Sequence, residues 1–105
     1  MIVYFTKQYL LDLYTKGEAD KKHRFQPEVI RKYVMVVNIM RNVADITKLW
    51  QYKSLHYKKL TGNKSGISSV RVTSQYRVEF TEQTKDGQEV ATICNITELS
   101  NHYDD

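Results

Sequence analysis

The stretch SSVRVTSQYRVEF, residues 68–80, alternates apolar and polar side chains on both sides of a short polar connection. Period two places one set of side chains on a single face: Val70, Val72, Tyr76, Val78 and Phe80. The opposite face carries Ser69, Arg71, Arg77 and Glu79. A three-residue connection over 73–75 keeps the apolar face continuous, pairs Val72 with Tyr76 and places Arg71 opposite Arg77.

Two arginines directly opposite each other on an open face need an explanation, because like charges in this position destabilise a sheet. They are tolerated where an anion, commonly a phosphate, lies between them. Alternatively, the face is an ordinary solvated surface, on which Glu79 neutralises one of the arginines. The residues of the hairpin leave both interpretations open.

The chain before this hairpin predicts one strand and three helices. IVYF, residues 2–5, is the first strand. Thr6 is placed to cap a helix that ends at Gly17, and Pro27 opens a second helix that runs to near Val43. Asp45 is placed to cap a short third helix that contains Leu49 and Trp50.

The second half of the chain predicts strands at 57–60, 67–72, 76–84 and 89–97, and Asp86-Gly87 predicts a two-residue hairpin turn. The resulting order is typical of an α+β domain, in which an N-terminal strand precedes two to three helices that pack on one face of a mostly antiparallel sheet. The other face is expected to be open. With 105 residues, the chain is expected to form a single domain over 1–105.

Composition favours a cytoplasmic globular protein, with 41% hydrophobic and 27% charged residues. There is no apolar run of the ~20 residues that cross a bilayer, and the N-terminal residues do not resemble a signal peptide. The single cysteine, Cys94, excludes a zinc site built from several cysteines. Its place in an apolar strand pattern favours a buried thiol over a nucleophile.

The charge of the chain, +4 overall, is unevenly distributed. Residues 46–78 contain seven basic residues and no acidic one: Lys48, Lys53, Lys58, Lys59, Lys64, Arg71 and Arg77. A basic segment of this kind is typical of a protein that binds a polyanion. The alternative is a solvated surface on which the charges cluster by chance.

Residues 60–80, LTGNKSGISSVRVTSQYRVEF, closely resemble the signature LxGDxxGxxSIRINDQWRIxF of the HigB-type toxins. These are the plasmid maintenance system killer proteins within the RelE/ParE superfamily of toxin–antitoxin modules. The resemblance implies the same α+β fold. It also implies a ribosome-dependent mRNA endoribonuclease (an mRNA interferase) that needs no metal or other cofactor, inhibits translation and thereby arrests growth. In that chemistry the RNA 2′-hydroxyl attacks the adjacent phosphate.

By this resemblance, Arg71 and Arg77 hold the scissile phosphate. The chain departs from the family pattern at Lys58 and Thr61, which replace the histidine and lysine of HxLKG, and at residues 94–97, which replace VDYH. His102 is therefore the first candidate for the missing acid or base, and His56 is the second. His23 is expected at the surface. One alternative is that the KKHR run around it contacts ribosomal RNA.

The residues expected to bind RNA are Lys53, His56, Lys58, Lys59, Lys64 and Tyr103. The expected partners are the ribosome, mRNA and a HigA-like helix-turn-helix antitoxin, with no membrane. Because the C-terminal region is acidic, the antitoxin is expected to block entry to the ribosome rather than to cover the arginines. Two other functions stay open: inhibition of DNA gyrase by binding, as in the ParE branch, and RNA binding without catalysis.

Overall fold

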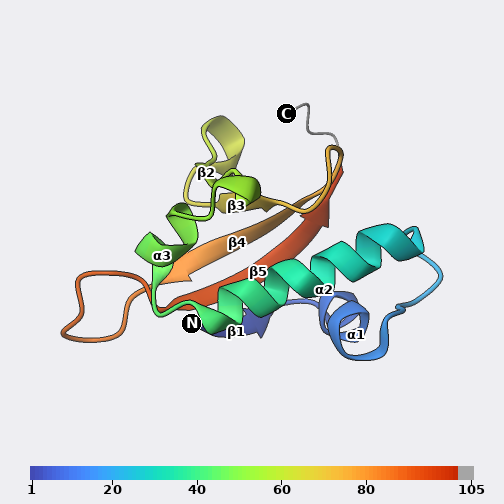
Figure 1. Cartoon of the computed structure of the whole chain (residues 1–105), viewed down its shortest axis with the longest axis horizontal. Coiled ribbons are helices and arrows are strands. Elements are labelled where there is room, and N and C mark those ends of the chain that lie inside the picture. Colours follow the sequence, from blue (N-terminus) through green and yellow to red (C-terminus); the bar gives the residue numbers. More distant parts are fainter. Residues whose placement is uncertain (102–105) are drawn as a thin grey trace.

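One five-stranded sheet organises residues 1–101, the part of the chain that this computed structural model describes (Figure 1). The elements in chain order are β1 (Ile2–Phe5), α1 (Gln8–Lys16), α2 (Pro27–Asn42), α3 (Ile46–Trp50), the 3-10 helix η1 (Lys53–Leu55), β2 (Lys58–Lys59), the 3-10 helix η2 (Gly62–Lys64), β3 (Ser68–Arg71), β4 (Arg77–Gln83) and β5 (Ile93–Ser100). The predicted α+β class is confirmed. α2, the longest helix, crosses one face of the sheet.

The strands lie in the order β1-β5-β4-β3-β2. β1 runs parallel to β5, and the other neighbouring pairs are antiparallel. The register of β4 against β5 shifts between Glu79 and Phe80, so that Glu79 lies opposite Glu98 while Phe80 lies opposite Ile96. Such a bulge bends and twists the sheet locally. It lies beside the arginine pair, at the centre of the sheet.

Local signals account for most helix boundaries. Pro27 is the first residue of α2, where its missing N–H costs nothing. The Asp45 side chain accepts hydrogen bonds from the backbone N–H groups of Thr47 and Lys48, and so caps α3 as predicted. Gly17 ends α1 in the left-handed conformation. The predicted cap at Thr6 is wrong, because α1 begins one residue later than that cap requires and Lys7 precedes its first residue.

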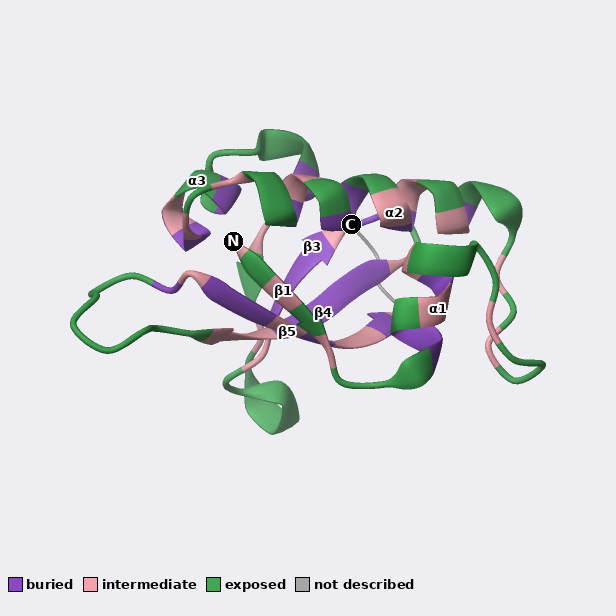
Figure 2. Cartoon of the chain, turned by 90° about the horizontal axis from the view of Figure 1, so that it is seen from below, coloured by how far each residue is buried: buried purple, intermediate pink, exposed green. Residues whose placement is uncertain are grey.

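The predicted two-residue hairpin at Asp86-Gly87 is also wrong. Gln83 pairs with Ile93, so the connection between β4 and β5 spans residues 84–92, and Gly87 forms a turn inside it at φ +80°. The connection extends away from the sheet, and residues 84–90 are exposed (Figure 2). Because these residues have no apolar face to bury, β5 begins later than predicted and continues to Ser100.

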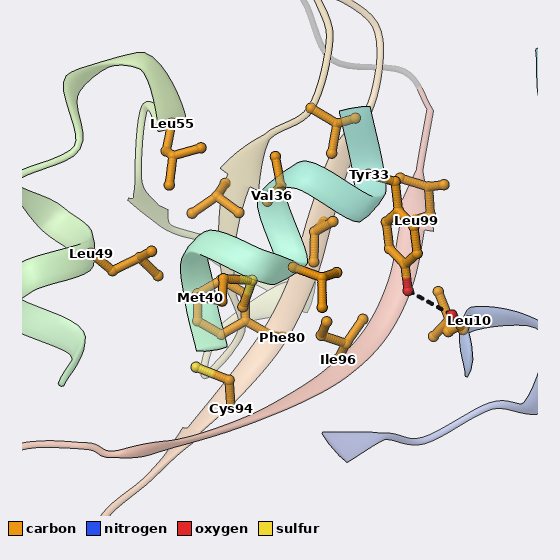
Figure 3. Packing of buried hydrophobic residues seen from close by; sticks show 14 of the residues in the cluster. Leu10, Tyr33, Val36, Met40, Leu49, Leu55, Phe80, Cys94, Ile96 and Leu99 are labelled. Atoms are coloured by element: carbon orange, nitrogen blue, oxygen red, sulfur yellow. Dashed lines mark hydrogen bonds between the residues drawn. The ribbon is translucent and has the colours of Figure 1, made fainter. Parts of the chain in front are cut away.

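The core fills the space between the sheet and the helices (Figure 3). Val70, Val78 and Phe80 of the hairpin are fully buried there, which confirms the predicted apolar face. α2 contributes Tyr33, whose hydroxyl donates to the backbone carbonyl of Leu10 at 2.8 Å and so ties α2 to α1. No helix within residues 1–101 is both long and apolar enough to span a bilayer.

Candidate functional site

The β3–β4 hairpin has the predicted register. Arg71 lies opposite Arg77, and Val72 N–H donates to the carbonyl of Tyr76 at 2.9 Å across the three-residue connection. The Thr73 hydroxyl oxygen accepts from the backbone N–H groups of Gln75 and Tyr76 at 3.2 and 3.1 Å, which stabilises the turn. The turn therefore holds the two arginines side by side on the face opposite the valines.

The expected position of Arg77 on the solvent side is wrong. Its side chain is 0% exposed, because it lies along the face of β3 and is covered there. Its Nε donates to the Ser69 hydroxyl at 2.9 Å, and its Nη2 donates to the carbonyls of Ser69, at 3.3 Å, and of His56. A buried guanidinium with these partners has no surface left for a bulky phosphodiester. Arg71 is half-buried and keeps part of its surface exposed.

Glu79 is the next residue on the same face of β4, and it is 3% exposed. Lys64 of η2 reaches across to it, with 2.8 Å between Lys64 Nζ and Glu79 Oε2. A lysine that was expected to contact RNA is thus ion-paired with a buried carboxylate. Such a pair places a positive charge near the arginines while compensating the buried negative charge.

A polar cleft of about 570 Å³ opens beside Arg71. Its lining comes from the beginning of α2, from the segment before β2 and from the β3–β4 turn: Gln26, Glu28, Val29, Lys32, Ser54, His56, Arg71, Val72, Thr73, Ser74 and Gln75. We call it the Arg71 cleft. Glu28 and Lys32 were not identified as site residues from the sequence; on α2 they form an i,i+4 ion pair at 3.5 Å.

His56 lines this cleft in an unusual backbone conformation, with φ 45° and ψ 54° at the end of η1. Its side chain is exposed, while its carbonyl accepts from buried Arg77. The sequence holds no local signal for this arrangement. The arrangement depends on the segment before β2 lying next to β3 and β4.

The other expected RNA-binding residues fall into two groups. Lys53, Lys58 and Lys59 are exposed, the first on η1 and the other two on the edge strand β2. Lys59 also lines a smaller cavity of about 360 Å³. His102, the first candidate for the acid or base, and Tyr103 lie outside the described residues. The described chain ends one residue after Ser100, the strand partner of Arg77.

His23 lies at the surface, as the sequence predicted, but it is half-buried. Its ring stacks on that of Tyr9, with 3.7 Å between centroids and 4° between planes, and its Nδ1 lies 2.8 Å from the Asp20 carboxylate. Tyr9 in turn donates to Glu98, which also pairs with Lys7 at 2.9 Å. Burial opposes ionisation of Glu98, but the hydrogen bonds from Tyr9 and Lys7 hold its pKa below the usual value. These contacts tie the loop before α2 to β5.

Cys94 is buried, as predicted. Burial raises the pKa of its thiol to about 12, so the reactive thiolate is suppressed at neutral pH. Within the described residues, no three histidine, cysteine or acidic side chains are grouped so as to hold a metal ion. The Arg71 cleft brings together Arg71 and His56, two of the site residues predicted from the sequence, and we take it as the candidate functional site.

No known family model matches this sequence, and neither does any curated protein sequence. Solved structures do match. The YoeB/ParE toxin from Agrobacterium tumefaciens superposes with a TM-score of 0.56 at 15% identity, over 98% of this chain and 100% of that one. YoeB from the YoeB-YefM toxin-antitoxin complex of Staphylococcus aureus gives 0.54 at 20% identity, over 98% of both chains. YafQ from E. coli gives 0.53 at 14% identity, over 94% of this chain and 90% of that one.

These matches span nearly the whole of each chain. The α+β architecture, with its mixed five-stranded sheet, is thus the fold of the YoeB and YafQ toxins. At such low identities the likeness concerns the arrangement of the elements.

Proposed function

We propose that this protein is the toxin of a type II toxin–antitoxin pair and that it cleaves mRNA on the ribosome without a metal ion. The observation that carries the proposal is the β3–β4 hairpin, which places Arg71 at a polar cleft within a fold that YoeB and YafQ share. The resemblance of residues 60–80 to the HigB-type signature covers this same hairpin. HigB-type specificity is part of the proposal.

Arg71 is the phosphate ligand in this proposal. A guanidinium binds two phosphate oxygens at once and stabilises the negative charge that develops as the 2′-oxygen attacks phosphorus. Arg77 is too deeply buried for that task, so its assignment changes from phosphate ligand to support for the site. His102 stays in the proposal as a candidate acid or base and Tyr103 as a candidate RNA-binding residue, and both lie outside the described residues.

RNA reaches the cleft over a basic surface. Lys53, Lys58 and Lys59 are exposed residues of one short segment, and residues 46–78 include no acidic residue. Phosphate contacts of this kind supply affinity without sequence preference. The surface therefore suits ribosomal RNA and mRNA together.

The proposed partner is an antitoxin, of the HigA-like helix-turn-helix type that the signature implies. The S. aureus YoeB structure is a complex with YefM, described as a toxin-antitoxin pair. We expect the antitoxin of this chain to block entry to the ribosome while leaving the Arg71 cleft open. If the purified complex binds a short RNA as tightly as the free toxin does, this mode of inhibition is supported; loss of binding would place the antitoxin on the cleft.

The proposal is tested by cleavage of an mRNA bound to purified ribosomes. The native protein should cut the message, and Arg71→Ala should reduce the cleavage rate by about 10²–10³-fold, because it removes a cation that meets developing charge. Lys85→Ala is the matched control, since Lys85 is an exposed basic residue in the 84–92 connection. An uncut message with the native protein would overturn the proposal.

Incorporation of labelled methionine and thymidine in induced cells separates the alternatives. Loss of methionine incorporation with cut transcripts supports the proposal. Loss of thymidine incorporation alone would indicate a ParE-like inhibitor of DNA gyrase. Loss of methionine incorporation with intact transcripts would indicate an RNA-binding protein without catalysis.

A further inference from the structure

The backbone of His56 is held in a conformation that its residue type seldom adopts. Within residues 1–101, His56 is the one residue besides glycine with a positive φ. A side chain with a Cβ is disfavoured there, so surrounding contacts must hold the conformation, and such residues cluster at functional sites. The question is what holds His56, and for what purpose.

Two contacts hold this backbone: the His56 N–H donates to the carbonyl of Lys53 at 3.2 Å, and the His56 carbonyl accepts from Arg77. The Arg77 guanidinium is anchored on β3 by the hydroxyl and carbonyl of Ser69, and its Nη2 reaches beyond β3 to the carbonyl of His56. The hydrogen bond to His56 thus joins β4 to the residues that precede β2. One of the contacts of this fully buried charged side chain is therefore with a backbone carbonyl at the cleft.

The hydrogen bond from Arg77 also determines which part of His56 faces solvent. The carbonyl of His56 accepts the hydrogen bond from Arg77. His56 is otherwise an exposed residue that lines the Arg71 cleft, so its imidazole is left to meet solvent. His56 precedes β2, which pairs with β3, and His56 and Arg71 both line the Arg71 cleft. The charged groups on the elements around it are Glu28 and Lys32 of α2, Lys53 of η1, Lys58 of β2, Arg71 of β3 and Arg77 of β4.

We propose that His56 is the general base of the reaction and that Arg77 is the positioning residue that presents it. This inference rests on the proposed ribonuclease function. As the 2′-oxygen bonds to phosphorus, its proton passes to the neutral imidazole of His56, and Arg71 binds the phosphate. The bond from phosphorus to the 5′-oxygen breaks, and this oxygen takes a proton from water. The imidazolium of His56 then gives its proton to the hydroxide that remains, so the protons balance. Histidine suits the task because its side chain exchanges a proton near neutral pH.

His56→Gly is the decisive variant, because glycine adopts a positive φ readily and the fold is not put at risk. Single-turnover cleavage of ribosome-bound mRNA should fall by about 10²-fold or more. Added imidazole should restore part of the rate, and this rescue should increase with pH as the free base becomes the main species. Imidazole should leave Arg71→Ala unimproved, since that variant lacks a phosphate ligand and keeps its base. Unchanged cleavage by His56→Gly, or lost cleavage that imidazole leaves unrestored, would overturn the assignment.

The role of Arg77 is tested by combining a substitution of Arg77 with His56→Gly. Arg77→Met, which keeps much of the side-chain volume, should reduce cleavage in the native background and have little further effect in His56→Gly, because both changes remove the same positioned base. Independent, multiplicative losses would overturn the link between Arg77 and His56. If the native protein itself cuts no mRNA, the proposed function fails instead, so the two failures are distinguishable.

Discussion

At the scale of single residues, the two arginines of the hairpin show how strand partners can have different environments. Arg71 and Arg77 are directly opposite each other, yet Arg77 is fully buried and Arg71 lies at the cleft. When the side chain of a central-strand residue lies across the neighbouring strand, that strand and the segment beyond it cover the side chain. We therefore expect Arg77 to contribute to stability, and Arg71 is the arginine that we propose as the phosphate ligand.

Arg77→Ala should decrease the free energy of unfolding by about 1–3 kcal/mol, because it leaves the carbonyl of His56 and the hydroxyl of Ser69 without this donor. Arg71→Ala should decrease it by less than about 1 kcal/mol, since the residue is only half-buried. Urea denaturation of both variants measures the difference. Equal stabilities would contradict the structural role of Arg77.

Cys94 and Tyr57 should make stability decline in alkali. Burial raises the pKa of Cys94 to about 12, and burial together with a hydrogen bond to Glu82 raises the pKa of Tyr57 to about 12. In the unfolded chain these groups lose their protons at lower pH, from about pH 9 for the thiol. Stability is therefore complete below about pH 9 and is lost as the pH rises toward 12.

Urea denaturation between pH 7 and pH 11 checks this expectation. Cys94→Ala is the control, because it should show a shallower decline above pH 9 whatever its stability at neutral pH. A free energy of unfolding that stays constant to pH 11 would contradict it.

At the scale of elements, two connections of the sheet have different roles. The β3–β4 turn is short, is ordered by the Thr73 hydroxyl and lines the Arg71 cleft. The β4–β5 connection over 84–92 is longer, and its residues 84–90 are exposed. Only the first of these connections sets the position of a proposed functional residue.

A pair of insertions tests this difference. Gly-Ser-Gly inserted after Gly87 should change the free energy of unfolding by less than about 1 kcal/mol, because a longer exposed loop costs little entropy. The same insertion after Ser74 should reduce mRNA cleavage by at least about tenfold, since misplacing a phosphate ligand by a small distance is costly. Comparable cleavage by the two insertion variants would show that the turn does not position Arg71.

At the scale of the whole molecule, the exposed lysines of η1 and β2 extend the positive surface away from the Arg71 cleft. Lys64 and Glu79 offset each other within the same region. The proposed RNA-binding surface is thus smaller than a count of basic residues in 46–78 implies. It is concentrated at the β2 edge of the sheet.

Ribosome binding should weaken steeply as salt increases, because each phosphate contact releases counterions. Replacing both Lys58 and Lys59 by Gln should decrease the slope of log affinity against log salt by about 1–2. Replacing Lys16 and Lys85 by Gln, which removes the same charge from other exposed positions, should leave the slope unchanged. Equal effects of the two pairs would indicate a response to net charge alone.

The sequence by itself determined most of the elements and the register of the β3–β4 hairpin, because these depend on short-range patterns. Alternation over 68–80 predicted that Arg71 faces Arg77, and Pro27, Gly17 and Asp45 marked helix ends, as the structure confirms. The tertiary structure decided which arginine is buried and how His56 is presented. Period two identifies the face on which a side chain lies but not what covers that face. One of the groups that contact Arg77, the carbonyl of His56, comes from a segment about twenty residues earlier in the chain, which leads into β2, the partner of β3.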